Sequence, residues 1–263
     1  SGGSGGGGGD RDRDRDGDED DGDHEPDWFD VGCRAQGPLV AQVIAAFGQT
    51  WRHIERGTTG YGLALSGRLP RLKTAAAQGP GDLATAAFSA GRPRRSDIRR
   101  RYRAAIQQAE RRIWIANAYF LPSAAIRRDL ARAARRGVDV RLLMPGRATD
   151  VWPLHLATRH LLDSLLAAGV QVFESHDRMV HAKCALVDDG WWTIGSANLD
   201  PRSRFHNLEA NVVGVGGSAV GELEGIFAGL LPSLVELTRA QWLAQPLGRR
   251  LLGRFFYYFR YLM

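Results

Sequence analysis

Residues 180–214, VHAKCALVDDGWWTIGSANLDPRSRFHNLEANVVG, decide the fold that we expect for this chain. Two apolar runs, 179–187 and 191–195, flank the turn residues Asp188, Asp189 and Gly190, and this pattern is typical of a β-hairpin. A third apolar run at 209–215 predicts the next strand. The segment therefore predicts neighbouring antiparallel strands.

Upstream of this hairpin, strand patterns alternate with helix patterns. The strands are expected at 113–120, 138–144 and 170–175, and the helices at 96–111 (with Ser96 as N-cap), 123–136 and 151–168. A helical region is also expected from 218 to about 241. Such alternation predicts parallel βαβ units, so the expected fold class is α/β, with a mixed β-sheet flanked by helices on both faces.

The pattern His181-x-Lys183-x4-Asp188 is the first candidate for chemistry. Residues two apart on a strand share one face, so His181 and Lys183 are expected side by side. One side chain can then attack while the other holds charge. A single pair of this kind also occurs on surfaces without a function, and the continuation of the sequence decides the interpretation.

Three polar residues continue the pattern. Ser196 and Asn198 follow the second hairpin strand, where short polar side chains can donate hydrogen bonds to phosphate oxygens. Glu209 enters an otherwise apolar strand, which packing explains poorly. We expect its carboxylate to accept a hydrogen bond from His181 and to fix the tautomer of the imidazole.

The stretch 180–214 resembles the second catalytic motif region of the phospholipase D superfamily, and within it most closely the bacterial cardiolipin synthases. The similarity extends over about residues 96–216. It implies a phospholipase D-like domain in which a motif histidine attacks the phosphodiester phosphorus and a second, symmetry-related histidine protonates the leaving alcohol. It also implies that Asp188 is chiefly structural, and that neither a metal nor another cofactor is required.

The family builds one active centre from two such motifs. The resemblance implies that five residues form one half of that centre, here called the half-site: His181, Lys183, Ser196, Asn198 and Glu209. In this reading Lys183, Asn198 and Ser196 hold the phosphate oxygens, where charge develops in the transition state. No other histidine of the sequence has a lysine two residues further on, so the second motif is absent from the sequence.

The residues outside the region of similarity suggest that the chain is a piece of a two-motif protein. Residues 1–27 are a Gly/Asp/Arg-rich stretch that we expect to be disordered, and 28–56 resemble the strand and helix that close a first half, with the helix beginning at Pro38. Residues 57–95 are expected as a linker, 96–241 as the catalytic half, and 242–263 as a basic, aromatic C-terminal segment. The first residue, a serine, adds to the expectation of a truncated or split protein.

Three outcomes follow for activity. Two copies dimerise so that their His181 residues face each other, another polypeptide supplies the second half-site, or the isolated chain is inactive. Inactivity is our first expectation. Phosphatidyl transfer in cardiolipin synthesis is the leading function, and a phosphodiesterase acting on nucleic acid or a non-catalytic lipid-binding remnant are the alternatives.

Charge and composition narrow the partners. Residues 10–30 contain three arginines and twelve acidic residues, a net charge of −9, and the remainder of the chain after residue 30 therefore carries 32 basic and 17 acidic residues. Such a basic body favours a polyanion, either nucleic acid or an anionic membrane surface. Two cysteines are too few for a disulfide framework, and their surroundings lack zinc-ligand spacing.

The leading function sets the expected partners and location. We expect the anionic phospholipids phosphatidylglycerol and cardiolipin as partners, with nucleic acid the weaker expectation. The chain is expected at the cytoplasmic face of the cell membrane without a transmembrane helix, since no apolar run approaches the 18 to 20 residues or so that a span needs. Residues 249–263 read equally as an interfacial segment or as a helix that docks on the domain. Tyr119, Phe120 and Trp152 either line a lipid channel or fill the core.

Overall fold

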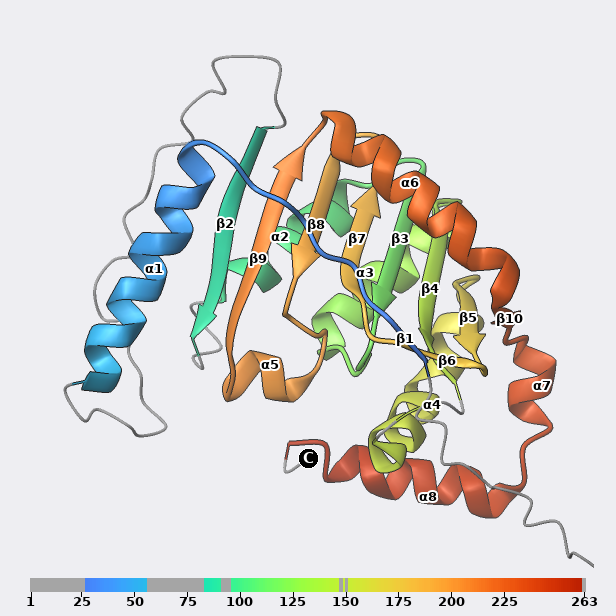
Figure 1. Cartoon of the computed structure of the whole chain (residues 1–263). Helices are drawn as coiled ribbons and strands as arrows, with labels where there is room; N and C mark the ends of the chain where they lie inside the picture. The colour runs from blue at the N-terminus through green and yellow to red at the C-terminus, as the bar shows by residue number, and fades with distance from the viewer. Residues whose placement is uncertain (1–26, 56–82, 91–95, 147–148, 150, 262–263) are drawn as a thin grey trace, which may run out of the picture.

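A mixed sheet of eight strands forms the body of the protein in the computed structural model, which describes residues 27–55, 83–90, 96–146, 149 and 151–261 (Figure 1). The strands, in their order across the sheet, are β10 (Val235–Glu236), β5 (Gln171–Ser175), β4 (Asp139–Pro145), β3 (Arg112–Asn117), β7 (Lys183–Val187), β8 (Trp191–Gly195), β9 (Leu208–Val215) and β2 (Leu83–Ala90). The predicted tail and most of the predicted linker lie outside the described residues.

The sheet has a parallel part and an antiparallel part, and the edge strand β10 pairs antiparallel with β5. Strands β3, β4 and β5 run parallel, whereas β7, β8, β9 and β2 form an antiparallel ladder that joins the parallel part through the antiparallel pair β3–β7. The hairpin predicted at the centre of the sequence is the pair β7–β8. The α/β class with a mixed sheet is therefore confirmed.

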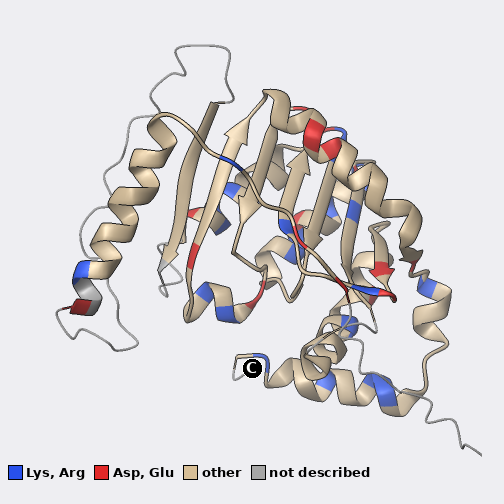
Figure 2. Ribbon diagram, in the orientation of Figure 1, with Lys and Arg blue, Asp and Glu red and all other residues tan. Residues whose placement is uncertain are grey.

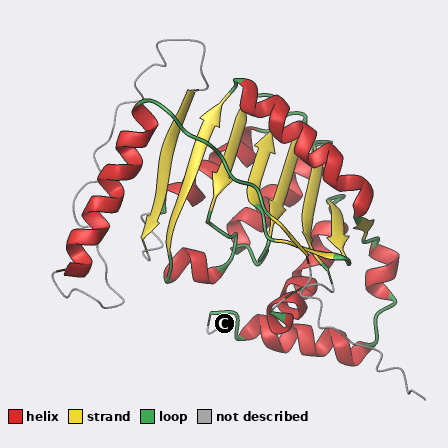
Figure 3. Ribbon diagram, viewed as in Figure 1, coloured by secondary structure: helices red, strands yellow, loops and turns green. Residues whose placement is uncertain are grey.

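Helices cover both faces of the sheet, as predicted (Figure 3). On one face, α2 (Asp97–Gln108), α3 (Ala124–Arg135) and α4 (Trp152–Leu166) bury residues such as Tyr102, Leu130 and Leu162 in one apolar cluster. On the other face, α6 (Ser218–Leu230) buries Phe227 and its neighbours against a second cluster. Burial on both faces explains why the central strands are nearly continuous apolar runs.

The predictions of a linker over 57–95 and of a helical region over 218–241 were wrong because tertiary pairing overrode weak local patterns. The expected linker contains β2, an edge strand of small residues that pairs along its whole length with β9. The expected helical region 218–241 is interrupted: α6 is followed by the 3₁₀ turn Leu231–Ser233, then by β10 and α7 (Arg239–Leu243). Pro232 lies in that turn and has no N–H to continue the helix.

The segment before the main domain lies across the sheet. Strand β1 (Asp27–Phe29) pairs in parallel with the short β6 (Arg178–Val180). Helix α1 (Pro38–Glu55) begins at Pro38 as predicted and packs beside β2. Figure 2 shows α1 without charged residues except at its C-terminal end, and its outer face exposes Ile44 and Phe47.

The C-terminal helix α8 (Leu247–Tyr258) docks on α4 (Figure 1). A Cβ on Gly253 would lie 2.7 Å from the carbonyl oxygen of Leu156, so only glycine allows the two backbones to approach this closely. The rings of Trp152 and Phe256 meet edge to face with centroids 5.3 Å apart. Within the described ranges, no helix has the length and apolar character that crossing a bilayer requires.

The turn between β7 and β8 is anchored by Asp188, which adopts a left-handed φ of 51°. Its carboxylate accepts hydrogen bonds from the backbone N–H groups of Glu110, Arg111 and Arg112, at 3.1, 2.8 and 3.0 Å. Burial acts to raise the pKa of this carboxyl, but the three N–H donors outweigh it and hold the pKa below its ordinary value. Asp188 thus ties the hairpin to the start of β3.

Replacing Asp188 with asparagine keeps the shape of the side chain and removes its charge. We expect Asp188→Asn to lower the free energy of unfolding by about 1–2 kcal/mol near neutral pH, because N–H groups bind a carboxylate more strongly than an amide oxygen. A lowered pKa stabilises the fold above the unfolded value of about 4, so the deficit shrinks as the pH falls below it.

Urea denaturation at neutral and acidic pH measures this deficit. Asp177→Asn, at an exposed position, is the control and leaves the midpoint unchanged. A deficit in Asp188→Asn that is equal at both pH values would contradict the assignment.

Candidate functional site

The half-site lies at one edge of the sheet because of the direction of three strands. Lys183 begins β7, Gly195 ends β8 and Leu208 begins β9. Since β8 runs antiparallel to both neighbours, these three positions share one edge. The alternation of strand direction thus gathers residues that are up to 28 positions apart in the sequence, from His181 to Glu209.

His181 lies in a break of the ladder between β6 and β7, so the prediction of one continuous strand over 179–187 was wrong. The two side chains nevertheless meet: Nζ of Lys183 lies 2.7 Å from Nε2 of His181. Lys183 is almost fully buried, which confines its ammonium group to this neighbourhood. The backbone N–H of His181 donates instead to the carbonyl oxygen of Phe29 in β1, at 2.8 Å.

Asp30 is the carboxylate that orients His181. Its Oδ2 lies 2.8 Å from Nδ1 of the imidazole. An ammonium group facing Nε2 and a carboxylate facing Nδ1 are both satisfied when Nδ1 carries the proton and Nε2 keeps its lone pair. The ring of Trp28 packs against the imidazole with centroids 4.6 Å apart. Trp28 in β1 and Asp30 directly after it therefore orient the histidine, a role that was not predicted from the sequence.

Glu209 does not bind His181, so that expectation was wrong. Its carboxylate accepts hydrogen bonds from the hydroxyl of Ser196 and from Nδ2 of Asn207. The reason is the strand order: β8 lies between β7 and β9, and two strand spacings of about 4.8 Å each exceed the reach of one hydrogen bond. The hydroxyl of Ser196 can donate only one hydrogen bond, and it donates that bond to the carboxylate of Glu209.

Buried amides hold the loop after β8 in place. Oδ1 of Asn198 accepts a hydrogen bond from the backbone N–H of Tyr119 at 3.2 Å. Asn117, at the end of β3, accepts from the N–H of Leu199 at 3.1 Å, and Asn211 accepts from the N–H of Ala197 at 3.2 Å. Asn117 and Asn211 were missed from sequence. A buried asparagine inside an apolar strand is the signal that points to them.

Gly195, at the end of β8, lies too close to β9 for a side chain. A Cβ at this position would lie 2.3 Å from the carbonyl oxygen of Ala210 on β9. The end of β8 therefore approaches β9 more closely than any other residue permits.

Asp200 is a further buried acid beside the half-site. It caps α5 (Pro201–Phe205), with its carboxylate accepting the N–H of Ser203 at 2.7 Å. Burial raises the pKa of Asp200 to about 6, against the opposing effect of the bond from Ser203. Since the folded state favours the protonated form, the stability that this group contributes declines as the pH rises from about 4 to that value.

The three aromatic residues considered for a channel have different surroundings. Phe120 is buried in the core, and Trp152 contacts α8. Tyr119 faces the site, with its ring centroid 6.5 Å from that of His181.

Across the described residues, no three His, Cys, Asp or Glu side chains come together as metal ligands, and the absence of a cofactor stays a prediction.

Comparison with protein families gives a match over residues 102–231 to the model described as "Cardiolipin synthase, PLD-like domain". Cardiolipin synthase B of Escherichia coli K12 is 47% identical over 119 residues, which are 45% of this chain and 29% of that protein. Cardiolipin synthase A of Pseudomonas aeruginosa is 38% identical over 149 residues, 55% of this chain and 30% of that protein. The chain thus spans under a third of the length of these relatives.

Solved structures show the same fold at low identity. The phospholipase D family member Nuc from Salmonella typhimurium superposes with a TM-score of 0.50 at 20% identity, covering 59% of this chain and 97% of Nuc. Phosphatidylserine synthase from Haemophilus influenzae superposes with a TM-score of 0.58 at 14% identity, covering 68% of this chain and 48% of that one.

The carboxylate that fixes the histidine tautomer can be identified by matched substitutions. We expect Asp30→Ala to weaken the preference of neutral His181 for a proton on Nδ1, because the acceptor at Nδ1 is lost while the ammonium group of Lys183 still faces Nε2. Glu209→Gln is expected to leave that preference intact, since this residue contacts Ser196 instead. Nitrogen chemical shifts of the ¹⁵N-labelled imidazole measure the tautomer. A change in Glu209→Gln without a change in Asp30→Ala would refute the assignment.

Proposed function

We propose that this chain, whose residues 102–231 belong to the phospholipase D superfamily as a cardiolipin synthase-like domain, transfers phosphatidyl groups in phospholipid synthesis. The observation that carries the proposal is the arrangement of His181 between Asp30 and Lys183. It keeps the proton on Nδ1 and the lone pair on Nε2, and this lone pair becomes the nucleophile when the ammonium group of Lys183 moves from Nε2 to the oxygens of an anionic phosphodiester. The donor lipid is phosphatidylglycerol and the product is cardiolipin.

The reaction proceeds in two displacements at phosphorus. First, Nε2 of His181 attacks, a P–N bond forms, and the P–O bond to the glycerol leaving group breaks. The leaving oxygen takes a proton from an opposing histidine. That histidine then removes the proton from the acceptor hydroxyl, whose oxygen attacks phosphorus as the P–N bond breaks and His181 is regenerated. Lys183 and Asn198 stabilise the charge on the non-reacting oxygens.

The opposing histidine comes from a second half-site, supplied by another copy of the chain or by another polypeptide. Two features support this part of the proposal. Asp30, which orients His181, lies outside the matched domain and precedes it in the chain. In addition, the outer face of α1 is apolar, with Ile44 and Phe47 exposed, and such a face favours further protein packed against it.

Turnover of phosphatidylglycerol tests the catalytic role of His181. Where a second copy of the chain supplies the opposing half-site, we expect vesicles incubated with the wild type to accumulate cardiolipin, measured by mass spectrometry. His181→Ala is expected to reduce the amount at least about 100-fold because the nucleophile is lost. His176→Ala, at an exposed position, is the matched control and retains activity. Equal amounts from wild type and His181→Ala would refute catalysis by the chain on its own. Cleavage of DNA in place of lipid would favour the nuclease alternative.

We further propose that the chain binds the cytoplasmic face of the cell membrane peripherally through the outer face of α8. One side of this helix packs on α4, and the other exposes Leu247, Leu251, Phe255 and Tyr258 at successive turns, with Leu251 65% exposed and Phe255 54% exposed. Arginines 249, 250 and 254 lie on the same helix. An exposed apolar stripe with basic neighbours suits the boundary between acyl chains and anionic headgroups.

Substitution on two helices separates this surface from other exposed apolar residues. We expect Leu251→Ser/Phe255→Ser to weaken binding to phosphatidylglycerol vesicles roughly tenfold or more, because two apolar anchors are lost. Ile44→Ser/Phe47→Ser makes a comparable change on α1, at another side of the molecule, and should leave binding unchanged (Figure 1). Vesicle sedimentation measures both. Equal weakening by the two double variants would rule out α8 as the specific contact.

A further inference from the structure

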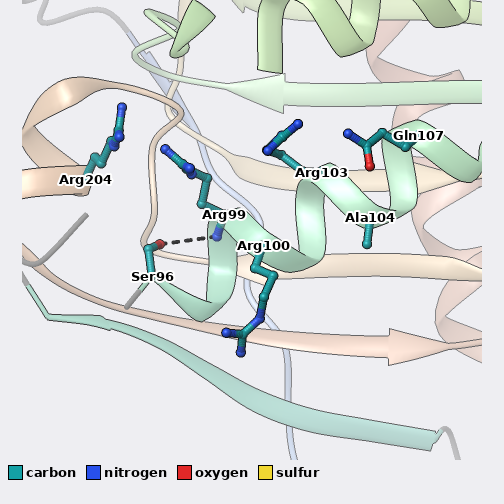
Figure 4. A pocket seen from close by; sticks show the side chains of 7 residues that line it. All are labelled: Ser96, Arg99, Arg100, Arg103, Ala104, Gln107 and Arg204. Carbon is teal, nitrogen blue, oxygen red and sulfur yellow. Dashed lines mark hydrogen bonds between the residues drawn. The ribbon is translucent and has the colours of Figure 1, made fainter. Parts of the chain in front are cut away.

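A second basic site lies outside the half-site, in a pocket between α2 and α5 (Figure 4). The pocket has a volume of about 570 Å³, which exceeds what a phosphate group needs. Its lining consists of Ser96, Arg99, Arg100, Arg103, Ala104, Gln107 and Arg204. Four of the seven lining residues are arginines, and none has a role in the proposed reaction.

Two of these arginines already have acidic partners. Nε of Arg103 lies 2.8 Å from Asp129, and Arg100 pairs with Asp97. In Figure 4 the side chain of Arg100 leaves α2 in the direction opposite to that of Arg99 and Arg103. Neither Arg100 nor Arg103 therefore brings an uncompensated charge to the pocket.

Arg99 and Arg204 differ from these. No ion pair found between described residues includes either of them, and the side chain of Arg99 extends toward Arg204 (Figure 4). Nε of Arg204 is buried and has no hydrogen-bond partner within the described part of the chain. The charges of Arg99 and Arg204 are therefore not offset by an acidic side chain within the described residues.

The two guanidinium groups also repel each other. Burial, and then the charge of Arg103, lower the pKa of Arg99; burial, and then the charge of Arg99, lower the pKa of Arg204. An anion bound between them would relieve this repulsion. Paired guanidinium forks fit phosphate oxygens in particular.

The pocket adjoins both the half-site loop and the C-terminal segment. A smaller cavity next to it shares Ser96, Arg99 and Arg204 and is also lined by Asn198. On the other side, the guanidinium of Arg204 stacks over Phe205, whose ring meets that of Tyr261 at 5.8 Å. A phosphate in the pocket would lie between the half-site and the segment that follows α8.

We propose that Arg99 and Arg204 form a second phosphate-binding subsite, separate from the half-site and filled by a phosphate-bearing anion. The anion is either the headgroup phosphate of a phospholipid in the bilayer or a soluble phosphate. Binding requires no turnover, so the subsite is independent of whether His181 is a nucleophile.

Calorimetric titration with inorganic phosphate tests the subsite in the full chain. Arg99→Gln/Arg204→Gln is expected to weaken phosphate binding at least tenfold. Arg128→Gln/Arg135→Gln removes the same charge from exposed positions on α3 and is expected to stay within twofold of the wild type. Arg99→Lys/Arg204→Lys keeps the positive charge but lacks the forked guanidinium groups, and it should bind phosphate with intermediate affinity. Thermal unfolding checks that all variants are folded.

Vesicles distinguish the two sources of phosphate. If the headgroup is the ligand, the wild type prefers phosphatidylglycerol to phosphatidylcholine vesicles and the Arg99→Gln/Arg204→Gln variant loses that preference. If a soluble phosphate is the ligand, only the calorimetric result changes. The proposal is overturned if Arg99→Gln/Arg204→Gln matches the wild type in both measurements, or if the α3 variant is weakened equally.

Discussion

The antiparallel pairing of β3 with β7 is the constraint on which the site depends. It joins the parallel strands β3, β4 and β5 to the antiparallel ladder, and its register places Asn117 opposite Lys183. Asp188 holds the other end of this pair through three backbone hydrogen bonds. Because the register is fixed, the end of β3 and the start of β7 meet at the edge where ligands of α/β sheets bind.

The histidine at this edge is oriented by a segment that precedes the domain. The pairing of β1 with β6 brings Trp28 and Asp30 to the imidazole of His181. The backbone N–H of His181 also donates a hydrogen bond to the carbonyl oxygen of Phe29 in β1. The carboxylate of Glu209 instead accepts a hydrogen bond from the hydroxyl of Ser196. The two carboxylates therefore act on different parts of the half-site, although both lie at the same edge of the sheet.

Arginine side chains lie near the half-site, in the pocket of α2 and α5 and on α8. Helices α5 and α8 lie toward the same edge of the sheet (Figure 1), and the ring of Phe205 in α5 lies 5.8 Å from that of Tyr261, which follows α8. Asp129 neutralises the charge of Arg103, so not every arginine of this pocket is available to an anion. Arg99 and Arg204 concentrate the positive charge at one place.

The sequence by itself determined the α/β class, the central hairpin, the N-cap Ser96 and the contact between His181 and Lys183, because these follow from local spacing and from turn chemistry. Only the tertiary structure decided that β2 closes the sheet and that Asp30 rather than Glu209 binds His181. The bond from Asp30 spans 151 positions of the chain, and no local pattern encodes such a pairing. Strand order separates Glu209 from His181 by a whole strand, and strand order is set by packing of the complete sheet.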